Sequence, residues 1–236
     1  MTAQEISKIL RRLADPQIAG HSQRFFKTGP GQYGEGDLFL GIRVPVLREQ
    51  AKKFKNAPLG EVQSLLKSAY HEERLCALLL LVQKFSQGNP ADQKAVYELY
   101  LKNTRYINNW DLVDLSAYWV VGAWLADKDR HPLYALAHSK SLWERRIAII
   151  STFYFIKNRQ FADTLKIAKL LLTDREDLMH KAAGWMLREV GKRDSIAEKE
   201  FLKAHYSRMP RTMLRYAIEK FPEKERLKYL KGLVTS

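Results

Sequence analysis

The sequence predicts an all-α protein built as a stack of antiparallel helical hairpins. Two observations lead to this fold class. Helix-length blocks with a similar mixture of apolar, aromatic and charged residues return along the 236 residues, and strand patterns are nearly absent. Within these blocks Arg74, Arg146, Lys181 and Arg215 stand 72, 35 and 34 residues apart. A period of about 35 residues is typical of helical-hairpin solenoids. We therefore expect one repeat domain over residues 1–236.

Local signals place helices from the N-terminus onward. Ile6, Ile9 and Leu10 have helical spacing and end before Asp15-Pro16, whereas Pro45 suits the first turn of another helix. Further turns and a last helix are marked by Gly88-Asn89-Pro90, Arg130-His131-Pro132 and Phe221-Pro222. The whole chain therefore reads as helices joined by short turns.

Residues 27–37 hold Gly29, Gly31, Gly34 and Gly36, four of the twelve glycines. A phosphate-binding loop would follow a strand and open a helix, but here a helix comes first and Leu38-Phe39-Leu40-Gly41 follows. We interpret the Gly29–Gly36 loop as a flexible connector.

The net charge of the chain indicates the kind of partner that it binds. Forty Lys and Arg against 26 Asp and Glu give a net charge of +14 and a pI near 9.8. Such a surface favours nucleic acid, although an acidic membrane surface or plain solvation would also suit it. We expect no membrane span, and Met1-Thr2-Ala3-Gln4-Glu5-Ile6 lacks the layout of a signal peptide, so a cytoplasmic location is predicted. Cys76, the one cysteine, is predicted to be a buried, inert thiol.

A candidate site lies in the later repeats. Asn109 is a good N-cap, so Trp110 would open a helix and Asp114 would lie one turn later on the same face. If successive helices stack in register, Trp110, Asp114, Arg146 and Trp185 converge on a concave surface that duplex DNA could contact.

Four ordered blocks identify a family. They are Phe39-Leu40-Gly41-Ile42-Arg43-Val44-Pro45, Trp110-Asp111-Leu112-Val113-Asp114, Trp143-Glu144-Arg145-Arg146 and Ala183-Gly184-Trp185-Met186-Leu187-Arg188-Glu189. From about Arg24 to Glu219 the chain resembles the AlkD-type DNA alkylation repair family, HEAT-like-repeat alkylpurine DNA glycosylases. The resemblance implies a right-handed stack of about six hairpins. It also implies a monofunctional hydrolase that removes N3- or N7-alkylated purines from duplex DNA without a deep base-flipping pocket.

By this resemblance, Asp114 corresponds to the catalytic aspartate, Trp110 and Trp185 to the tryptophans beside the lesion, and Arg146 to a backbone contact. Further DNA contacts are predicted at Arg188, Lys181, Arg145, Phe25, Lys27, Arg74 and Arg215. Near Phe25 the family carries a tyrosine, so this entrance departs from the pattern. We expect a monomer with no cofactor, no metal and no lysine Schiff base.

Simpler interpretations remain open. Asp114 could simply be the ion-pair partner of a neighbouring arginine, with no catalytic role. Trp119, Trp124 and Trp143 are predicted to be core residues. The six histidines lack metal-ligand spacing and are interpreted as solvent-facing or cap residues. The chain could also be a non-catalytic binder of damaged or branched DNA, or a protein-interaction scaffold.

Overall fold

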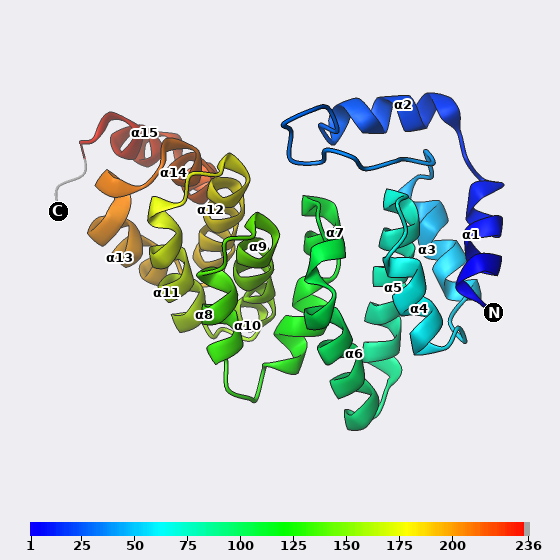
Figure 1. Ribbon diagram of the computed structural model, residues 1–236. Coiled ribbons are helices and arrows are strands. Elements are labelled where there is room, and N and C mark those ends of the chain that lie inside the picture. The colour runs from blue at the N-terminus through cyan, green and yellow to red at the C-terminus, as the bar shows by residue number, and fades with distance from the viewer. Residues whose placement is uncertain (234–236) are drawn as a thin grey trace. The chain divides into compact units, whose positions relative to one another are not determined.

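The computed structural model describes residues 1–233, and among these the chain is helical without a strand. One isolated parallel bridge joins Leu38 and Tyr70. The chain divides into two compact units, Met1–Val120 and Val121–Ser236. Figure 1 colours the first from blue to green and the second from green to red. The all-α helical fold predicted from the sequence is therefore confirmed.

The first unit is organised around one long helix, α5, which packs against α3, α4, α6 and α7, while α1 packs on α4 (Figure 1). Its helices are α1 (Ala3–Arg11), α2 (Pro16–Phe25), α3 (Val44–Lys53), α4 (Leu59–Leu66), α5 (His71–Gln87), α6 (Pro90–Lys102), the short 3-10 helix η1 (Thr104–Tyr106) and α7 (Trp110–Asp114). A π-helical turn, η2 (Tyr118–Gly122), follows α7.

The second unit is organised around α12, which packs against α9, α13 and α14 (Figure 1). Its helices are α8 (His131–Ala137), α9 (Leu142–Ser151), α10 (Phe153–Lys157), α11 (Ala162–Leu170), η3 (Leu171–Thr173), α12 (Asp177–Gly191), α13 (Ser195–His205), η4 (Tyr206–Arg208), α14 (Arg211–Ala217), η5 (Ile218–Lys220) and α15 (Glu223–Lys231).

The helix starts follow from side-chain caps. Thr2 and Glu5 form a capping box on α1, and Asn89 and Asp92 form another on α6. In each box the side chain of the capping residue accepts from a backbone N–H of the first turn, and the acid of that turn accepts from the backbone N–H of the capping residue. Asp15 accepts from the backbone of Gln17 and Ile18 at the start of α2. These polar residues therefore fix where α1, α2 and α6 begin.

The register of the repeat differs by one residue from the one predicted. Arg74 donates through Nη1 to the carbonyls of Ser68 and Ala69, at 2.9 and 3.1 Å. Arg145 makes the same pair of bonds to Ser139 and Lys140, both at 3.0 Å. The ring of His180 contacts the carbonyl of Asp174, again six residues back. Arg145 and His180, and not Arg146 and Lys181, are therefore the positions equivalent to Arg74, at spacings of 71 and 35 residues.

Two glycines of the second unit mark close helix crossings with the same spacing. A Cβ on Gly122 would lie 2.2 Å from the carbonyl oxygen of Ser151, and one on Gly184 would lie 2.4 Å from that of Met213. In both pairs the carbonyl belongs to the residue 29 positions later. Because Gly184 directly precedes Trp185, this contact between α12 and α14 fixes the helix that carries the tryptophan.

Candidate functional site

Trp110 opens α7, as predicted, and its capping residue is Asn109. The Asn109 Oδ1 atom accepts a 2.8 Å hydrogen bond from the Trp110 backbone N–H. The half-buried indole is stacked on the ring of Phe26, with centroids 5.4 Å apart and planes 26° apart. Phe25 meets the same indole edge-on at 6.0 Å and is 57% exposed. The helix α7 therefore presents Trp110 next to an exposed aromatic ring from the end of α2.

Beneath these rings lies a buried histidine that the sequence did not single out. His71, at the start of α5, is 2% exposed, which overturns its interpretation as a solvent-facing residue. Its Nε2 atom lies 2.8 Å from Asp111 Oδ2, and its Nδ1 atom lies 3.4 Å from Asp37 Oδ2. Burial lowers the pKa of His71, but the charge and hydrogen bond of Asp111 and the hydrogen bond of Asp37 outweigh burial and raise it to about 9. His71 is therefore an imidazolium at neutral pH.

Asp114 closes the single turn of α7 and is half-buried. Because it follows Trp110 by four residues, its carboxylate lies on the same face of the helix one turn later. Its charge reaches the buried phenol of Tyr100: burial raises the pKa of Tyr100, and the nearby Asp114 carboxylate raises it further. The Asp114 carboxylate therefore lies near a fully buried phenol.

The Gly29–Gly36 loop is tied down more firmly than a plain connector. The Gly29 backbone donates to the Gln32 side chain, and the Gly31 backbone donates to Glu35 Oε2. Gly34 approaches the chain so closely that a Cβ would lie 2.5 Å from the Phe26 carbonyl oxygen and 3.5 Å from Asn109 Nδ2. The loop therefore folds back against the residues that precede and cap α7.

Trp185 occupies the middle of α12 in the second unit. Its indole N–H donates to Glu189 Oε1 at 3.3 Å, and its ring lies 6.1 Å from that of Phe153. Glu189 also pairs with Lys192 at 2.6 Å and with Arg193 at 3.0 Å. Burial raises the pKa of Glu189, but hydrogen bonds from Lys192 and Arg193 outweigh it and lower the pKa. An ionised carboxylate therefore holds the tryptophan.

Three arginines predicted to contact DNA do not fit that role. Arg74 is 3% exposed and pairs with Asp37 at 2.7 Å. Arg145 binds Asp174 through Nε at 2.6 Å and uses Nη1 for two backbone carbonyls. Arg146 is buried and donates through Nη1 to the Leu178 carbonyl at 2.6 Å. Because these guanidinium groups are engaged with protein oxygens, they support helix packing.

The other predicted contacts lie nearer the solvent. Arg188 is half-buried and pairs with Glu219, and Lys181 pairs with Asp177 at 2.8 Å one turn earlier on α12. Phe25, Lys27 and Arg215 are exposed. Trp110 and Asp114 belong to the first unit, and Arg146 and Trp185 to the second. Arg146 is buried, so it does not belong to a common surface, and convergence of Trp110, Asp114 and Trp185 stays a prediction.

Other sequence interpretations have mixed outcomes. Cys76 is buried, as predicted, and burial raises the pKa of its thiol to about 12. Trp119 is 42% exposed, so its assignment to the core was wrong, and Trp124 and Trp143 are only half-buried. Within residues 1–233 no cluster of His, Cys, Asp and Glu could hold a metal ion. None of the helices in that range has the length and apolar character that crossing a bilayer requires.

One signal in the sequence indicates that the start of α5 needs charged or polar partners, although it does not identify them. Three consecutive ionisable residues, Glu72, Glu73 and Arg74, stand at the start of an otherwise apolar helix, and all are buried. Glu72 accepts from the backbone N–H groups of residues 40–42 at 2.7 to 3.2 Å. Charges in an apolar block require partners, because unpaired charges are costly to bury. Those partners come from segments distant in sequence.

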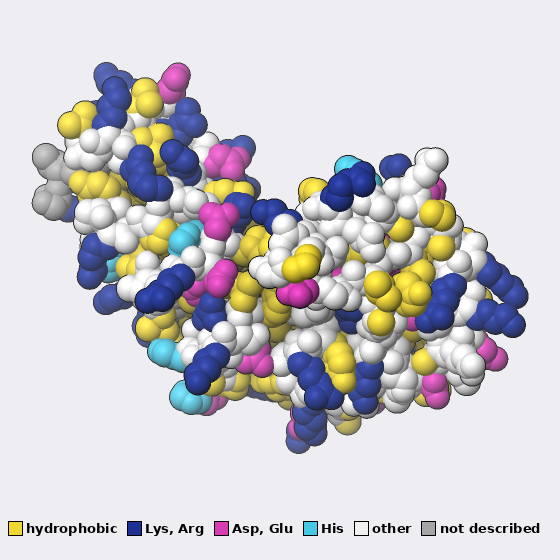
Figure 2. Space-filling view, turned by 45° about the horizontal axis from the view of Figure 1, so that its top comes forward, with side chains coloured by type: hydrophobic (Ala, Val, Ile, Leu, Met, Phe, Trp, Pro, Cys, Tyr) yellow, Lys and Arg dark blue, Asp and Glu magenta, His cyan; other side chains and the backbone are white. Residues whose placement is uncertain are grey.

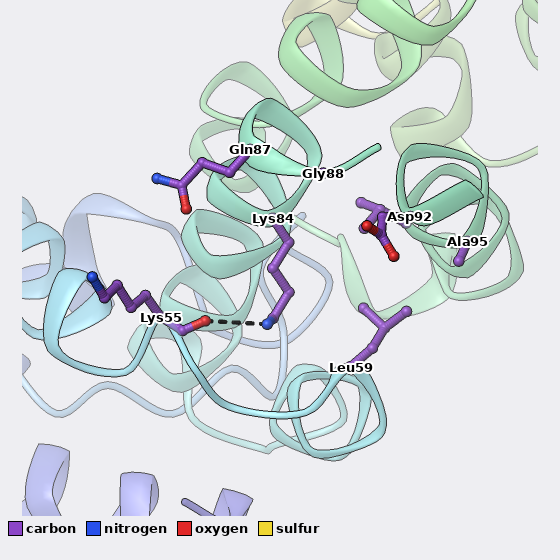
Figure 3. Close-up of a pocket in the computed structure, with 8 residues that line it drawn as sticks. Lys55, Leu59, Lys84, Gln87, Gly88, Asp92 and Ala95 are labelled. Atoms are coloured by element: carbon purple, nitrogen blue, oxygen red, sulfur yellow. Dashed lines mark hydrogen bonds between the residues drawn. The ribbon is translucent and has the colours of Figure 1, made fainter. Parts of the chain in front are cut away.

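Figure 3 shows a cavity of about 380 Å³ elsewhere in the first unit. Its lining includes Lys55, Leu59, Lys84 and Asp92, and Lys84 Nζ donates to the Lys55 carbonyl at 3.1 Å. No residue predicted to act in the site lines it. On the face drawn in Figure 2, Lys and Arg side chains are spread over both units.

A family model described as "DNA alkylation repair enzyme" matches residues 6–221. The chain belongs to the DNA alkylation repair enzyme family. Membership confirms the resemblance found in the four sequence blocks and supports a role in DNA repair. A solved structure, "Predicted DNA alkylation repair enzyme from Enterococcus faecalis", shares the fold with a TM-score of 0.69. It is 19% identical, and the match covers 89% of this chain and 97% of that one. A search among curated proteins found no match to this family member.

Proposed function

We propose that the protein is a monofunctional DNA glycosylase that hydrolyses the N-glycosidic bond of cationic N3- or N7-alkylated purines in duplex DNA. The observation that carries this proposal is the geometry of α7. A capped single turn projects an indole and a carboxylate from one face, four residues apart, and an exposed ring from α2 lies beside the indole. Membership of the DNA alkylation repair enzyme family supports DNA as the substrate.

The reaction needs few protein groups. An N3- or N7-alkylated purine is already cationic, so it departs as a neutral base and requires no general acid. Positive charge then develops on the sugar in the transition state, as in other glycoside hydrolyses. The Asp114 carboxylate stabilises that charge and orients the attacking water. The base leaves with the bonding electrons, and water supplies the hydroxyl group that replaces it.

Each of the two tryptophans is proposed to attract a cationic lesion. The electron-rich face of an indole attracts a cation by about 0.5 to 2 kcal/mol, depending on desolvation. Trp110 and Trp185 are both half-buried and both held by neighbouring side chains. They therefore recognise the lesion by stacking beside it, which is compatible with a site that has no deep base-flipping pocket.

Phosphate contacts are proposed for basic side chains that reach solvent. Lys27 and Arg215 are exposed, and Lys181 and Arg188 are held by Asp177 and Glu219, partners that are themselves exposed. Such contacts fix the position of the protein on DNA without reading its sequence. Phe25 is proposed to meet the DNA beside Trp110.

The test is release of free base from methylated duplex DNA. Wild type should release 3-methyladenine or 7-methylguanine, detected by chromatography of the supernatant, whereas Asp114→Asn should release neither. Asp127→Asn is the matched control, because Asp127 is exposed and pairs only with the neighbouring Lys128. It should behave as wild type.

Each other outcome points to a different function. Normal release by Asp114→Asn would remove Asp114 from the mechanism. Absence of release by wild type, together with salt-sensitive duplex binding, would assign the protein to the non-catalytic DNA binders. Lack of duplex binding at low salt would favour a protein-interaction scaffold.

A further inference from the structure

A buried polar cluster lies directly beneath Trp110 and has no assigned role. It joins three segments: Asp37 after the Gly29–Gly36 loop, His71 and Arg74 on α5, and Asn108 and Asp111 around the start of α7. The Asp37 carboxylate contacts three of these residues: Arg74 at 2.7 Å, Asn108 Nδ2 at 3.1 Å and His71 at 3.4 Å. His71 contacts Asp111 at 2.8 Å. The cluster therefore links the loop to the helix that carries Trp110.

The charge of the cluster depends on one proton. With Asp37 and Asp111 ionised and Arg74 charged, the sum is zero only when His71 is an imidazolium. The neighbouring acids on α5 are engaged elsewhere, because Glu72 accepts from backbone N–H groups and Glu73 pairs with Ser68 and Arg11. Loss of the His71 proton would leave a net negative charge in a buried site, which is costly.

A cluster of aromatic rings connects His71 to Trp110. The imidazole, Phe26 and Phe39 contact one another, with centroids 4.6 Å apart for His71 and Phe39, 5.0 Å for His71 and Phe26, and 5.1 Å for Phe26 and Phe39. Phe26 also stacks on Trp110, with ring planes 26° apart. A shift of the imidazole would therefore displace Phe26, and with it the surface on which the indole rests.

The cluster and the adjacent capping residue Asn109 also contain polar atoms that lack a hydrogen-bond partner. Buried atoms of this kind are Arg74 Nε, Asn108 Oδ1, Asn109 Nδ2 and Asp111 Oδ1. Unsatisfied buried polar groups are rare in folded proteins and mark sites of strain or rearrangement. Beside them Lys27 adopts a left-handed backbone conformation with φ of 53°, unusual for a residue with a side chain. This region is thus less well satisfied than the rest of the core.

We propose that His71 is a positioning residue: its imidazolium, held between Asp37 and Asp111, locks the loop of residues 27–37 against α7 and fixes the orientation of Trp110. The role of His71 in orienting Trp110 is inferred from the contacts alone, whereas any effect of His71 on base release rests on the proposed function. Deprotonation of His71 at alkaline pH releases the lock.

The test follows histidine and tryptophan signals in the wild-type protein from pH 6 to pH 10 by NMR. Labelled histidine reports the midpoint of each of the six histidines, and 5-fluorotryptophan reports the surroundings of each of the five tryptophans. Trp110→Phe assigns the Trp110 signal. We expect His71 to titrate near pH 9, well above the ordinary histidine range, and the Trp110 signal to move with the same midpoint. The Trp185 signal is the internal control and should not follow His71.

A His71 midpoint near 6.5, or a Trp110 signal that ignores the titration of His71, would overturn the proposal. Because this measurement uses no His71 variant, failure to fold cannot obscure it. His71→Gln adds a second readout: if the variant folds, its Trp110 signal should be displaced at pH 7 and should lose the transition near pH 9. An undisplaced Trp110 signal in that variant would also contradict the lock.

Base release separates this proposal from the proposed function. If Trp110 follows His71 but wild type releases no methylated base, the positioning role stands and the glycosylase fails. If wild type releases base and Trp110 does not follow His71, the glycosylase stands and the positioning role fails. When both proposals hold, the single-turnover rate of base release should decrease as pH rises, with the same midpoint as the change in the Trp110 signal.

Discussion

Trp110 and Trp185 are held in different ways. The ring of Trp110 is stacked on Phe26, which also contacts the buried His71, whereas Trp185 donates its indole N–H to Glu189. The partners of Glu189, Lys192 and Arg193, reach solvent. Trp110 therefore depends on a buried, charge-balanced cluster, whereas Trp185 depends on a buried carboxylate whose basic partners reach solvent, an arrangement that contributes less to stability.

The two units also differ in charge. The first unit carries 16 Lys and Arg against 12 Asp and Glu, a net +4, and the second carries 24 against 14, a net +10. Long-range attraction to DNA grows with positive charge. The second unit therefore supplies most of the electrostatic attraction, while the first supplies the proposed catalytic carboxylate.

The largest expected change in the free energy of unfolding comes from removing the carboxylates beside Trp110 and Trp185. Asp111→Ala leaves the charge of His71 uncompensated in a buried cluster, and breaking a buried pair costs about 3 to 5 kcal/mol. Glu189→Ala frees side chains that can reach water, so we expect a loss of about 1 kcal/mol. Urea unfolding at pH 7 measures both. Equal losses in the two variants would contradict the contrast between the sites.

A smaller effect is expected from the helix crossing behind Trp185. Gly184→Ala places a methyl group against the Met213 carbonyl, and overpacking of this kind costs about 1 to 3 kcal/mol. Gly20→Ala is the matched control in the first unit, because nothing lies within 4 Å of its Cβ position and α2 is helical there. The control should be unchanged or more stable by up to about 1 kcal/mol. If thermal unfolding shows Gly184→Ala to be more stable than Gly20→Ala, the close contact between α12 and α14 at Gly184 would be contradicted.

The pH dependence of stability separates the units further. Glu198 in the second unit is 2% exposed, and burial raises its pKa to about 8, despite the opposing charges of Lys199 and Arg188. The folded state therefore holds this proton more tightly than the unfolded state does. The resulting stabilisation is complete below about pH 4.5 and is lost as pH rises through 8.

Glu198→Gln should flatten the stability profile between pH 4.5 and 8, because the amide does not ionise. The decline between pH 6.5 and 9, which comes from His71 in the first unit, should persist. Denaturant unfolding at several pH values gives the two profiles. A variant that retains the whole wild-type slope below pH 6.5 would show that Glu198 does not titrate in this range.

The smallest effect concerns individual phosphate contacts. Arg215→Ala should weaken binding of any duplex and reduce the slope of log affinity against log salt by about 1. Lys94→Ala, on the less basic first unit, is the control, since Lys94 lies opposite Glu98 and is not proposed to contact DNA. Fluorescence anisotropy over a salt series measures both slopes. A larger change for Lys94→Ala would reverse the assignment of charge attraction to the second unit.

The repeat fold could be predicted because its signals are local. Periodic apolar residues, the Asn109 cap and the starts of α2, α6 and α15 are all encoded within a few residues. The register was wrong by one residue because Arg145 and Arg146 are adjacent and basic, and spacing alone could not decide between them. Only the backbone carbonyls bound by Arg145 identify it as the equivalent of Arg74.

The network beneath Trp110 could not be predicted for a different reason. The carboxylates that charge His71 lie 34 residues before it and 40 residues after it. No local pattern connects Asp37, His71 and Asp111, so the histidine looked like an ordinary polar residue. The prediction for Trp119 was wrong in the opposite sense: the general burial preference of tryptophan suggested a core position, yet 42% of its surface is exposed.

The most direct test of the account compares chemistry with binding in a single variant. Single-turnover excision of 7-methylguanine and the Kd for the same duplex should be measured for wild type and Asp114→Asn. We expect excision to be lost in the variant while Kd changes less than about twofold, because a carboxylate that acts only in the transition state contributes little to ground-state binding. Excision at the wild-type rate, or a loss explained entirely by weaker binding, would contradict the assignment of Asp114.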